Sequence, residues 1–233
     1  MTTARAAGLL YVLMGATGAF ALQYVPRALV VPGDPAATAD RLRDSEALFR
    51  LGLAAELIST ITFIFTALVL YRLFQRVDRT LATLMVLFVL LSVPISLVNV
   101  LSEVVAMLLA TGGNALSAFG RSELDTLAFV AMRLHSQGFA LAEIFWGLWL
   151  MPLGILAMRS GFAPRVIGVL LIVAGSAYVV HAFTSFVLPQ YASVVANIAL
   201  LPEAGEISIV VWLLATRFGA ASRPRLEVAA APS

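Results

Sequence analysis

Long apolar runs alternate with short polar segments along most of the chain. Each run is about as long as the ~20 residues that an α-helix needs to cross the hydrocarbon core of a bilayer. The pattern predicts an all-α, polytopic membrane protein, built as a bundle of six transmembrane helices. The predicted spans cover about residues 6–25, 47–74, 81–110, 135–158, 164–187 and 194–217. They form one transmembrane domain over residues 1–217, and residues 218–233 are expected to be a disordered cytoplasmic tail.

The polar segment after the first span, predicted to be the first external loop, carries signals for a short helix. Asp34 is a favourable N-cap residue, and Pro35 follows at the first helical position. Ala36, Ala39 and Leu42 recur at helical spacing, which suits a helix that lies on a membrane surface. We therefore expect a short interfacial helix in this loop.

The first apolar run leaves an alternative open. Ala19, Phe20 and Ala21 are similar to a signal-peptidase site, which is typical of a cleaved signal peptide. Against cleavage, the run is as long as a full span, and only Arg5 precedes it. We expect the run to be retained as the first transmembrane helix.

Composition excludes several classes of protein. The chain is 61% hydrophobic and 12% charged, whereas soluble domains have roughly 45–50% apolar and about 25% charged residues. All fifteen basic residues are arginines, and they lie at the ends of apolar runs rather than in one patch, which argues against nucleic-acid binding. The absence of cysteine excludes disulfides, thiolate catalysis and cysteine-ligated metal sites.

The arginines also predict the topology. Nine of them fall on the side that holds both predicted termini, and five on the other side, with Arg133 inside the helix region. Cytoplasmic loops carry an excess of arginine and lysine. Both termini are therefore expected to be cytoplasmic.

Polar residues inside the predicted spans gather in the outward-facing half. One face of the third span carries four of them at helical spacing: Ser92, Ser96, Asn99 and Glu103. A charged residue at mid-helix costs about 2.5–3.5 kcal/mol on insertion scales. Arg133 is the only cation at that depth, so we expect most of the carboxylates to be hydrogen-bonded and some to be neutral. The candidate ligand-binding residues, in a polar pocket open to the outside, are Glu56, Asn99, Glu103, His135 and Glu206.

Three functions fit this pattern. The first is binding or movement of a small cation, an amine or a lipid headgroup through the pocket. The second is an intramembrane metal-dependent enzyme with His135, His181 and Glu206 as ligands. The third is a structural or regulatory subunit.

We find no phosphate loop, no nucleophile elbow and no dinucleotide fingerprint, so no cofactor and no catalytic residue is assigned. The expected partners are the lipid bilayer and a small ligand, with self-association left open. No internal inverted repeat is evident and the spans lack a clearly broken pair, which counts against classical secondary transport.

A series of short motifs resembles one known family. They include Leu48-Phe49-Arg50-Leu51-Gly52, Arg133-Leu134-His135, Ser160-Gly161-Phe162-Ala163-Pro164-Arg165 and Gly205-Glu206. Over about residues 5–217 the chain resembles the bacterial membrane family filed as domain of unknown function four-three-eight-six. The resemblance implies a bacterial inner-membrane protein and no activity.

The same resemblance bears on individual residues. It places Arg50, Glu56, His135 and Glu206 at polar motif positions. Structural roles are expected for four residues: Arg50, Arg133, Gly161 and Pro164. It also leads us to expect an acid at position 181 and an apolar residue at position 143. The chain has His181 and Glu143 there, which weakens any catalytic or metal role built on them.

Overall fold

The computed structural model describes residues 2–113, 116–203 and 205–216, apart from the side chains at 201 and 203. Within this part of the chain the secondary structure is helical and contains no strand. The prediction of an all-α membrane protein is therefore confirmed. The predicted tail, 218–233, lies outside the described residues.

The helices follow one another with short connections. In chain order they are α1 (Thr3–Ala19), the π-helical turn η1 (Phe20–Tyr24), α2 (Val25–Leu29), α3 (Pro35–Asp44), α4 (Glu46–Phe74), α5 (Arg79–Thr111), α6 (Arg121–Arg159), α7 (Arg165–Val187), the 3-10 turn η3 (Pro189–Tyr191), α8 (Ala192–Glu203) and α9 (Glu206–Ala215). Five of these helical segments are long and apolar enough to cross a membrane: Thr3–Leu29, α4, α5, α6 and α7.

The last predicted span differs from the other five. The structure divides it into α8, of 12 residues, and α9, of 10 residues, and neither has the ~20 residues needed to cross a bilayer alone. The sequence indicated no clearly broken pair of spans, and within the described residues the structure shows an interruption in the last predicted span. Pro202 lies in the last turn of α8 and Gly205 is the N-cap of α9, and both residue types weaken a continuous helix.

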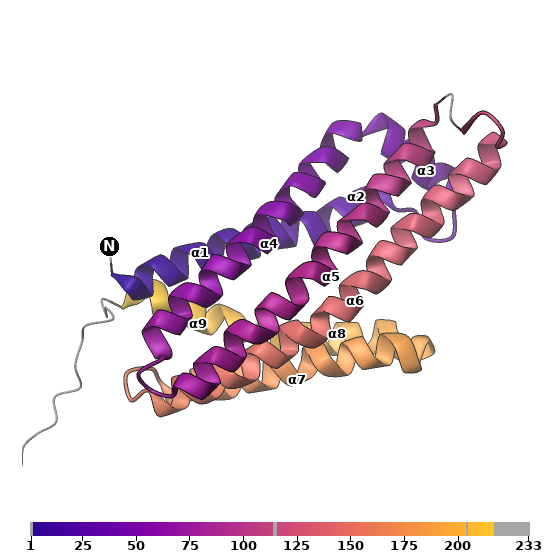
Figure 1. Cartoon of the computed structure of the whole chain (residues 1–233). Helices are drawn as coiled ribbons and strands as arrows, with labels where there is room; N and C mark the ends of the chain where they lie inside the picture. Colours follow the sequence, from indigo (N-terminus) through magenta and orange to yellow (C-terminus); the bar gives the residue numbers. More distant parts are fainter. Residues whose placement is uncertain (1, 114–115, 204, 217–233) are drawn as a thin grey trace, which may run out of the picture.

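The long helices pack side by side. Figure 1 shows α4, α5 and α6 next to one another, with α1 against α4 and α7 along the other side of α6. The returning helix α8 contacts α7, and α9 packs between α1 and α7. The bundle thus has two distinct ends. We call one the arginine end, because the turns there carry Arg72, Arg76, Arg79, Arg159 and Arg165; the other is the α3 end.

Helix α3 packs on protein. Asp34 caps it by accepting a hydrogen bond from the Ala37 N–H, as the sequence predicts. However, Ala39 and Leu42 are fully buried against the ends of α4, α5 and α6, whereas Ala36 is exposed. The expectation that Ala39 and Leu42 face a membrane surface is wrong, because this apolar face forms part of a second small core at the α3 end.

Helix α6 is held against α7 by four glycines. A Cβ atom added to Gly147 would lie 2.4 Å from the carbonyl oxygen of Gly175, and one added to Gly154 would lie 2.6 Å from that of Gly168. Only glycine allows two helix backbones to approach so closely. This seam fixes the position of α6, which carries three of the ionisable residues discussed below.

Candidate functional site

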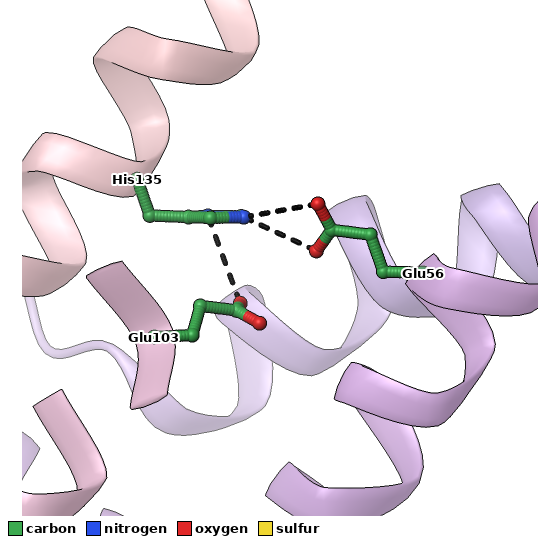
Figure 2. A group of neighbouring side chains, drawn as sticks. All are labelled: Glu56, Glu103 and His135. Carbon is green, nitrogen blue, oxygen red and sulfur yellow. Dashed lines mark hydrogen bonds and ion pairs between the residues drawn. The ribbon is translucent and has the colours of Figure 1, made fainter. Parts of the chain in front are cut away.

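His135 lies between two buried glutamates from two other helices. Its Nε2 atom, on α6, is 3.2 Å from Oε2 and 3.4 Å from Oε1 of Glu56 on α4. Its Nδ1 atom is 3.6 Å from Oε1 of Glu103 on α5. Figure 2 shows the imidazole ring with one carboxylate at each nitrogen. All three residues are at most 5% exposed. We call them the Glu–His–Glu cluster.

Asn99 anchors this cluster from one helical turn below Glu103 on α5. Its side-chain amide donates a hydrogen bond of 2.9 Å to the backbone carbonyl of His135. The Asn99 carbonyl oxygen occupies the space beside Gly138, where an added Cβ atom would lie 2.0 Å away. Helices α5 and α6 are therefore registered against each other at the level of the cluster.

Arg133 does not neutralise these carboxylates. It lies two residues before His135, a rotation of about 200° around the helix, and its side chain is exposed. Among the described residues, the ion-pair partner of both Glu56 and Glu103 is His135. Arg133, the only cation that the sequence places at that depth, therefore makes no ion pair with these acids among the described residues, and an imidazole lies beside them instead.

A cavity of about 810 Å³ opens beside the cluster, between α1, α4, α5, α6, α7, α8 and α9. Glu56, Asn99 and Glu206 line it, whereas Glu103 and His135 lie behind Glu56, outside the lining. The structure thus brings three of the five candidate ligand-binding residues to one cavity and places the other two in the cluster next to it.

Glu206 is the first residue of α9 and faces the cavity at the point where the last predicted span is interrupted. The Tyr11 hydroxyl, from α1, donates a hydrogen bond of 2.5 Å to its Oε2 atom. Tyr178, from α7, hydrogen-bonds the same carboxylate. Two tyrosines from distant parts of the chain therefore position this acid.

Glu143 and His181 form a carboxylate–imidazole pair on the cavity wall, in addition to the Glu–His–Glu cluster and Glu206. The Nδ1 atom of His181, on α7, is 2.9 Å from Oε2 of Glu143 on α6, and Glu143 is 4% exposed. These are the two positions at which the sequence departs from what its family resemblance implies, and they contact each other. Sequence reasoning gave neither Glu143 nor the two tyrosines a role in a site. Their polar groups inside apolar runs were the available signal.

The proposed ligand trio of His135, His181 and Glu206 is distributed over three groups. His135 belongs to the Glu–His–Glu cluster, His181 pairs with Glu143, and Glu206 bonds to Tyr11. In the described parts of the chain, the group that gathers three potential metal ligands is Glu56, Glu103 and His135.

The residues expected to be structural lie at the surface. Arg50 is exposed and pairs with Glu46 one turn away, at 2.6 Å. Gly161 has φ +69°, a left-handed conformation that favours glycine, in the turn after α6. Pro164 is the N-cap of α7.

Comparison with known proteins identifies the family. No curated protein and no solved structure matches the chain. The model of one family, described as Domain of unknown function (DUF4386), matches residues 6–216, which is nearly the whole chain. The motifs that suggested this family from the sequence lie within the match. The chain belongs to the DUF4386 family.

Proposed function

We propose that this protein binds a small organic amine in the 810 Å³ cavity, either free or as the headgroup of a lipid. The observation that carries the proposal is the convergence of three carboxylates on one cavity. Glu56, Glu143 and Glu206 come from α4, α6 and α9 and all line it. The volume lies within the range of about 300–1,000 Å³ that is usual for small-molecule sites.

Aromatic rings on the same wall favour an ammonium group over a bare ion. Tyr11, Trp149, Trp146 and Tyr178 line the cavity together with the three acids. An ammonium group is attracted to the faces of such rings as well as to carboxylates. A cavity with both features binds alkylated amines better than hydrated metal ions.

The side chain of Trp146 restricts the class of ligand further. Its indole N–H is buried and has no hydrogen-bond partner among the described residues. A buried tryptophan N–H normally has an acceptor. A ligand with an oxygen atom close to its amine, as in ethanolamine or choline, supplies one. Amino alcohols are therefore the favoured class.

The orientation of the protein is part of the proposal. The arginines of the α4–α5 and α6–α7 turns support a cytoplasmic arginine end, with both termini on that side of the bacterial inner membrane. Helices α8 and α9 together then form an interrupted sixth crossing, and α3 lies on the outer side. Interrupted helices commonly border the binding sites of membrane transporters, and Glu206 begins the second half of this one.

Binding is tested on the purified protein in detergent with choline, ethanolamine and tetramethylammonium. Trp146 and Trp149 line the cavity, so tryptophan fluorescence reports occupancy directly. We expect saturable binding of choline and none of 3,3-dimethyl-1-butanol, which has carbon in place of the nitrogen. Glu206→Gln keeps an oxygen for the Tyr11 hydroxyl, so the variant folds, and it weakens binding at least tenfold.

The matched control is Glu46→Gln. Glu46 pairs with Arg50 outside the cavity, so this variant also loses one carboxylate but keeps the site. Absence of binding by all three amines, or equal affinity in the Glu206→Gln and Glu46→Gln variants, would contradict the proposal.

Topology is tested separately with single cysteines, because the natural chain has none. Ala118→Cys lies at the α3 end and Thr80→Cys at the arginine end, and both positions are exposed. A maleimide that does not cross membranes should label the first variant and not the second in spheroplasts. The reverse pattern would overturn the orientation while leaving the cavity proposal intact.

A further inference from the structure

We propose that Glu56, Glu103 and His135 bind a divalent transition-metal ion, with Zn²⁺ as the favoured occupant. The two proposed sites share Glu56, which lines the cavity, but Glu103 and His135 do not line it, so variants at Glu103 and at Glu206 test the two proposals separately. It differs from the trio expected from the sequence, since only His135 is common to both sets.

The geometry of the cluster suits such an ion. One ligand atom from each residue can be chosen so that all three lie within 4.8 Å of one another. A tetrahedral ion with ligands at 2.0–2.2 Å holds its ligand atoms about 3.4 Å apart. The separation of His135 Nε2 from Glu56, 3.2 Å, is already close to that value. Glu103 lies 3.6 Å from the other ring nitrogen, Nδ1, so its side chain has to rotate to reach an ion held by Nε2 and Glu56. Rotation of the carboxylates closes the remaining difference.

The two ring nitrogens of His135 would have different roles. An ion takes one nitrogen of an imidazole, and the other N–H is usually held by a carboxylate that fixes the ring. Here a glutamate oxygen faces each nitrogen. With the ion on Nε2 and Glu56, Glu103 either completes the ligand set or holds the Nδ1–H and orients the ring, but not both. The hydrogen bond from Asn99 to the His135 carbonyl adds a further restraint on the backbone.

Charge balance favours the ion over a protonated histidine. Two ionised carboxylates and an imidazolium leave one negative charge, whereas two carboxylates, a neutral imidazole and a divalent ion are neutral. The residues next to the cluster in sequence include Leu57, Val104 and Leu134, which are exposed apolar side chains, as expected at a lipid-facing level. Within the described chain no arginine pairs with either glutamate. Neutrality is strongly favoured in such surroundings.

Glu103 provides a second, independent observation. Its residue is 3% exposed, yet no described residue donates a hydrogen bond to its carboxylate. Buried carboxylates nearly always accept hydrogen bonds or coordinate metals. Figure 2 shows this carboxylate directed at the histidine ring, where the ion would lie. Glu56 lines the cavity, which gives an ion a route to the cluster.

The test uses the full-length protein purified from cells grown with added Zn²⁺. We expect elemental analysis to find close to one Zn²⁺ per chain. After chelation, titration with Co²⁺ should produce visible d–d absorption bands that saturate at one equivalent and disappear on addition of Zn²⁺. Because the chain has no cysteine, the bands reflect only nitrogen and oxygen ligands.

Glu103→Gln is the decisive variant, since it removes one charge with almost no change in shape. We expect at least a tenfold loss of Zn²⁺ affinity, because even residues that only orient metal ligands contribute 10–100-fold. Glu206→Gln is the control, because it leaves the cluster unchanged and should keep full Zn²⁺ binding. Gel filtration of each variant verifies that it is folded.

Two results would overturn the inference. One is wild-type protein that binds neither Zn²⁺ nor Co²⁺ stoichiometrically, and the other is unchanged affinity in a folded Glu103→Gln variant. Either would leave the cluster as a metal-free ion pair. The two proposals fail independently, because Glu103→Gln should retain choline binding and Glu206→Gln should retain Zn²⁺ binding.

Discussion

The two halves of α6 are held in the bundle by opposite kinds of contact. From Arg121 to Glu143, the buried face carries Asp125, His135 and Glu143, and each of them pairs with a charged group on another helix. From Gly147 to Ala157, the buried face carries glycine, tryptophan and leucine, with no ionisable residue. One helix therefore contains a polar segment, whose buried side chains pair with charged groups on other helices, and an apolar segment that packs closely in the bundle.

Within the polar half, the pairs differ in how their charge is balanced. Asp125, at the α3 end, contacts two arginines: Arg43 at 2.8 Å and Arg121 at 3.5 Å. Arg43 also pairs with Asp40. Burial lowers the pKa of the Arg43 guanidinium, but its hydrogen bonds to Asp125 and Asp40 raise it by more. Glu56 and Glu103, in contrast, share one histidine. The three acids are similarly buried, at 6% exposed for Asp125 and at most 5% for Glu56 and Glu103, so the two groups differ in the number of cations that face each carboxylate.

The largest loss of stability is expected at the Glu–His–Glu cluster, where one histidine faces two carboxylates. His135→Leu leaves two buried carboxylates without a cation, and breaking a buried pair in this way costs about 3–5 kcal/mol. The free energy of unfolding in micelles, measured with denaturant, should fall by that amount. Adding Glu56→Gln and Glu103→Gln to the same chain removes the excess charge and should restore most of the loss. No recovery in the triple variant would contradict this account.

The second-largest loss of stability is expected in the apolar half of α6, from Gly147 to Ala157. Gly154→Ala places a methyl group against the Gly168 carbonyl, and overpacking of this kind typically costs about 1–3 kcal/mol. Gly15→Ala is the matched control, because no atom lies within 4 Å of the added Cβ. The thermal midpoint should fall for the first variant and stay equal or rise slightly for the second. Equal midpoints would mean that the seam between α6 and α7 is not tight.

The sequence predicted most of the framework. The observed α4, Glu46–Phe74, and α5, Arg79–Thr111, differ from the predicted spans by at most two residues at each end. Apolar runs with charged or glycine boundaries are reliable because the bilayer sets their length. The interruption before Glu206 was missed because hydropathy averages over Pro202 and Gly205, although the two residues together are the signal for it.

The site was predicted in part, for a physical reason. Position can be counted along each predicted span, so Glu56, Glu103 and His135 were expected near one level, and their side chains are neighbours in the structure. The rotation of each helix and the choice of partner depend on packing between helices. Tyr11 and Glu206 are 195 residues apart, and no local pattern connects them. The same limit made Arg133 look like a suitable cation for the acids.

The third effect tests how α5 and α6 are aligned at the cluster. Gly138→Ala displaces the Asn99 carbonyl, which lies 2.0 Å from the added Cβ, and thereby breaks the hydrogen bond to His135. We expect a loss of about 1–2 kcal/mol, the usual range for a buried hydrogen bond left unmade. In an Asn99→Ala background the same glycine substitution should cost much less, because the colliding atom is gone. Additive losses in the double variant would contradict the contact.

The smallest loss of stability is expected at Asp125, which is contacted by two arginines. Arg43→Gln removes one of the two arginines on Asp125, and the remaining contact with Arg121 limits the loss to about 0.5–1 kcal/mol, as for partly exposed pairs. The loss should shrink further in 0.5 M salt, because ions screen groups that water can reach. The loss caused by His135→Leu should not change with salt, since its partners are at most 5% exposed. A matched pair of unfolding curves at low and high salt measures both. If Arg43→Gln lowered stability as much as His135→Leu, and as independently of salt, the charges at Asp125 would be no better balanced than those of the Glu–His–Glu cluster. The charge argument for a metal ion at the Glu–His–Glu cluster would then lose its basis.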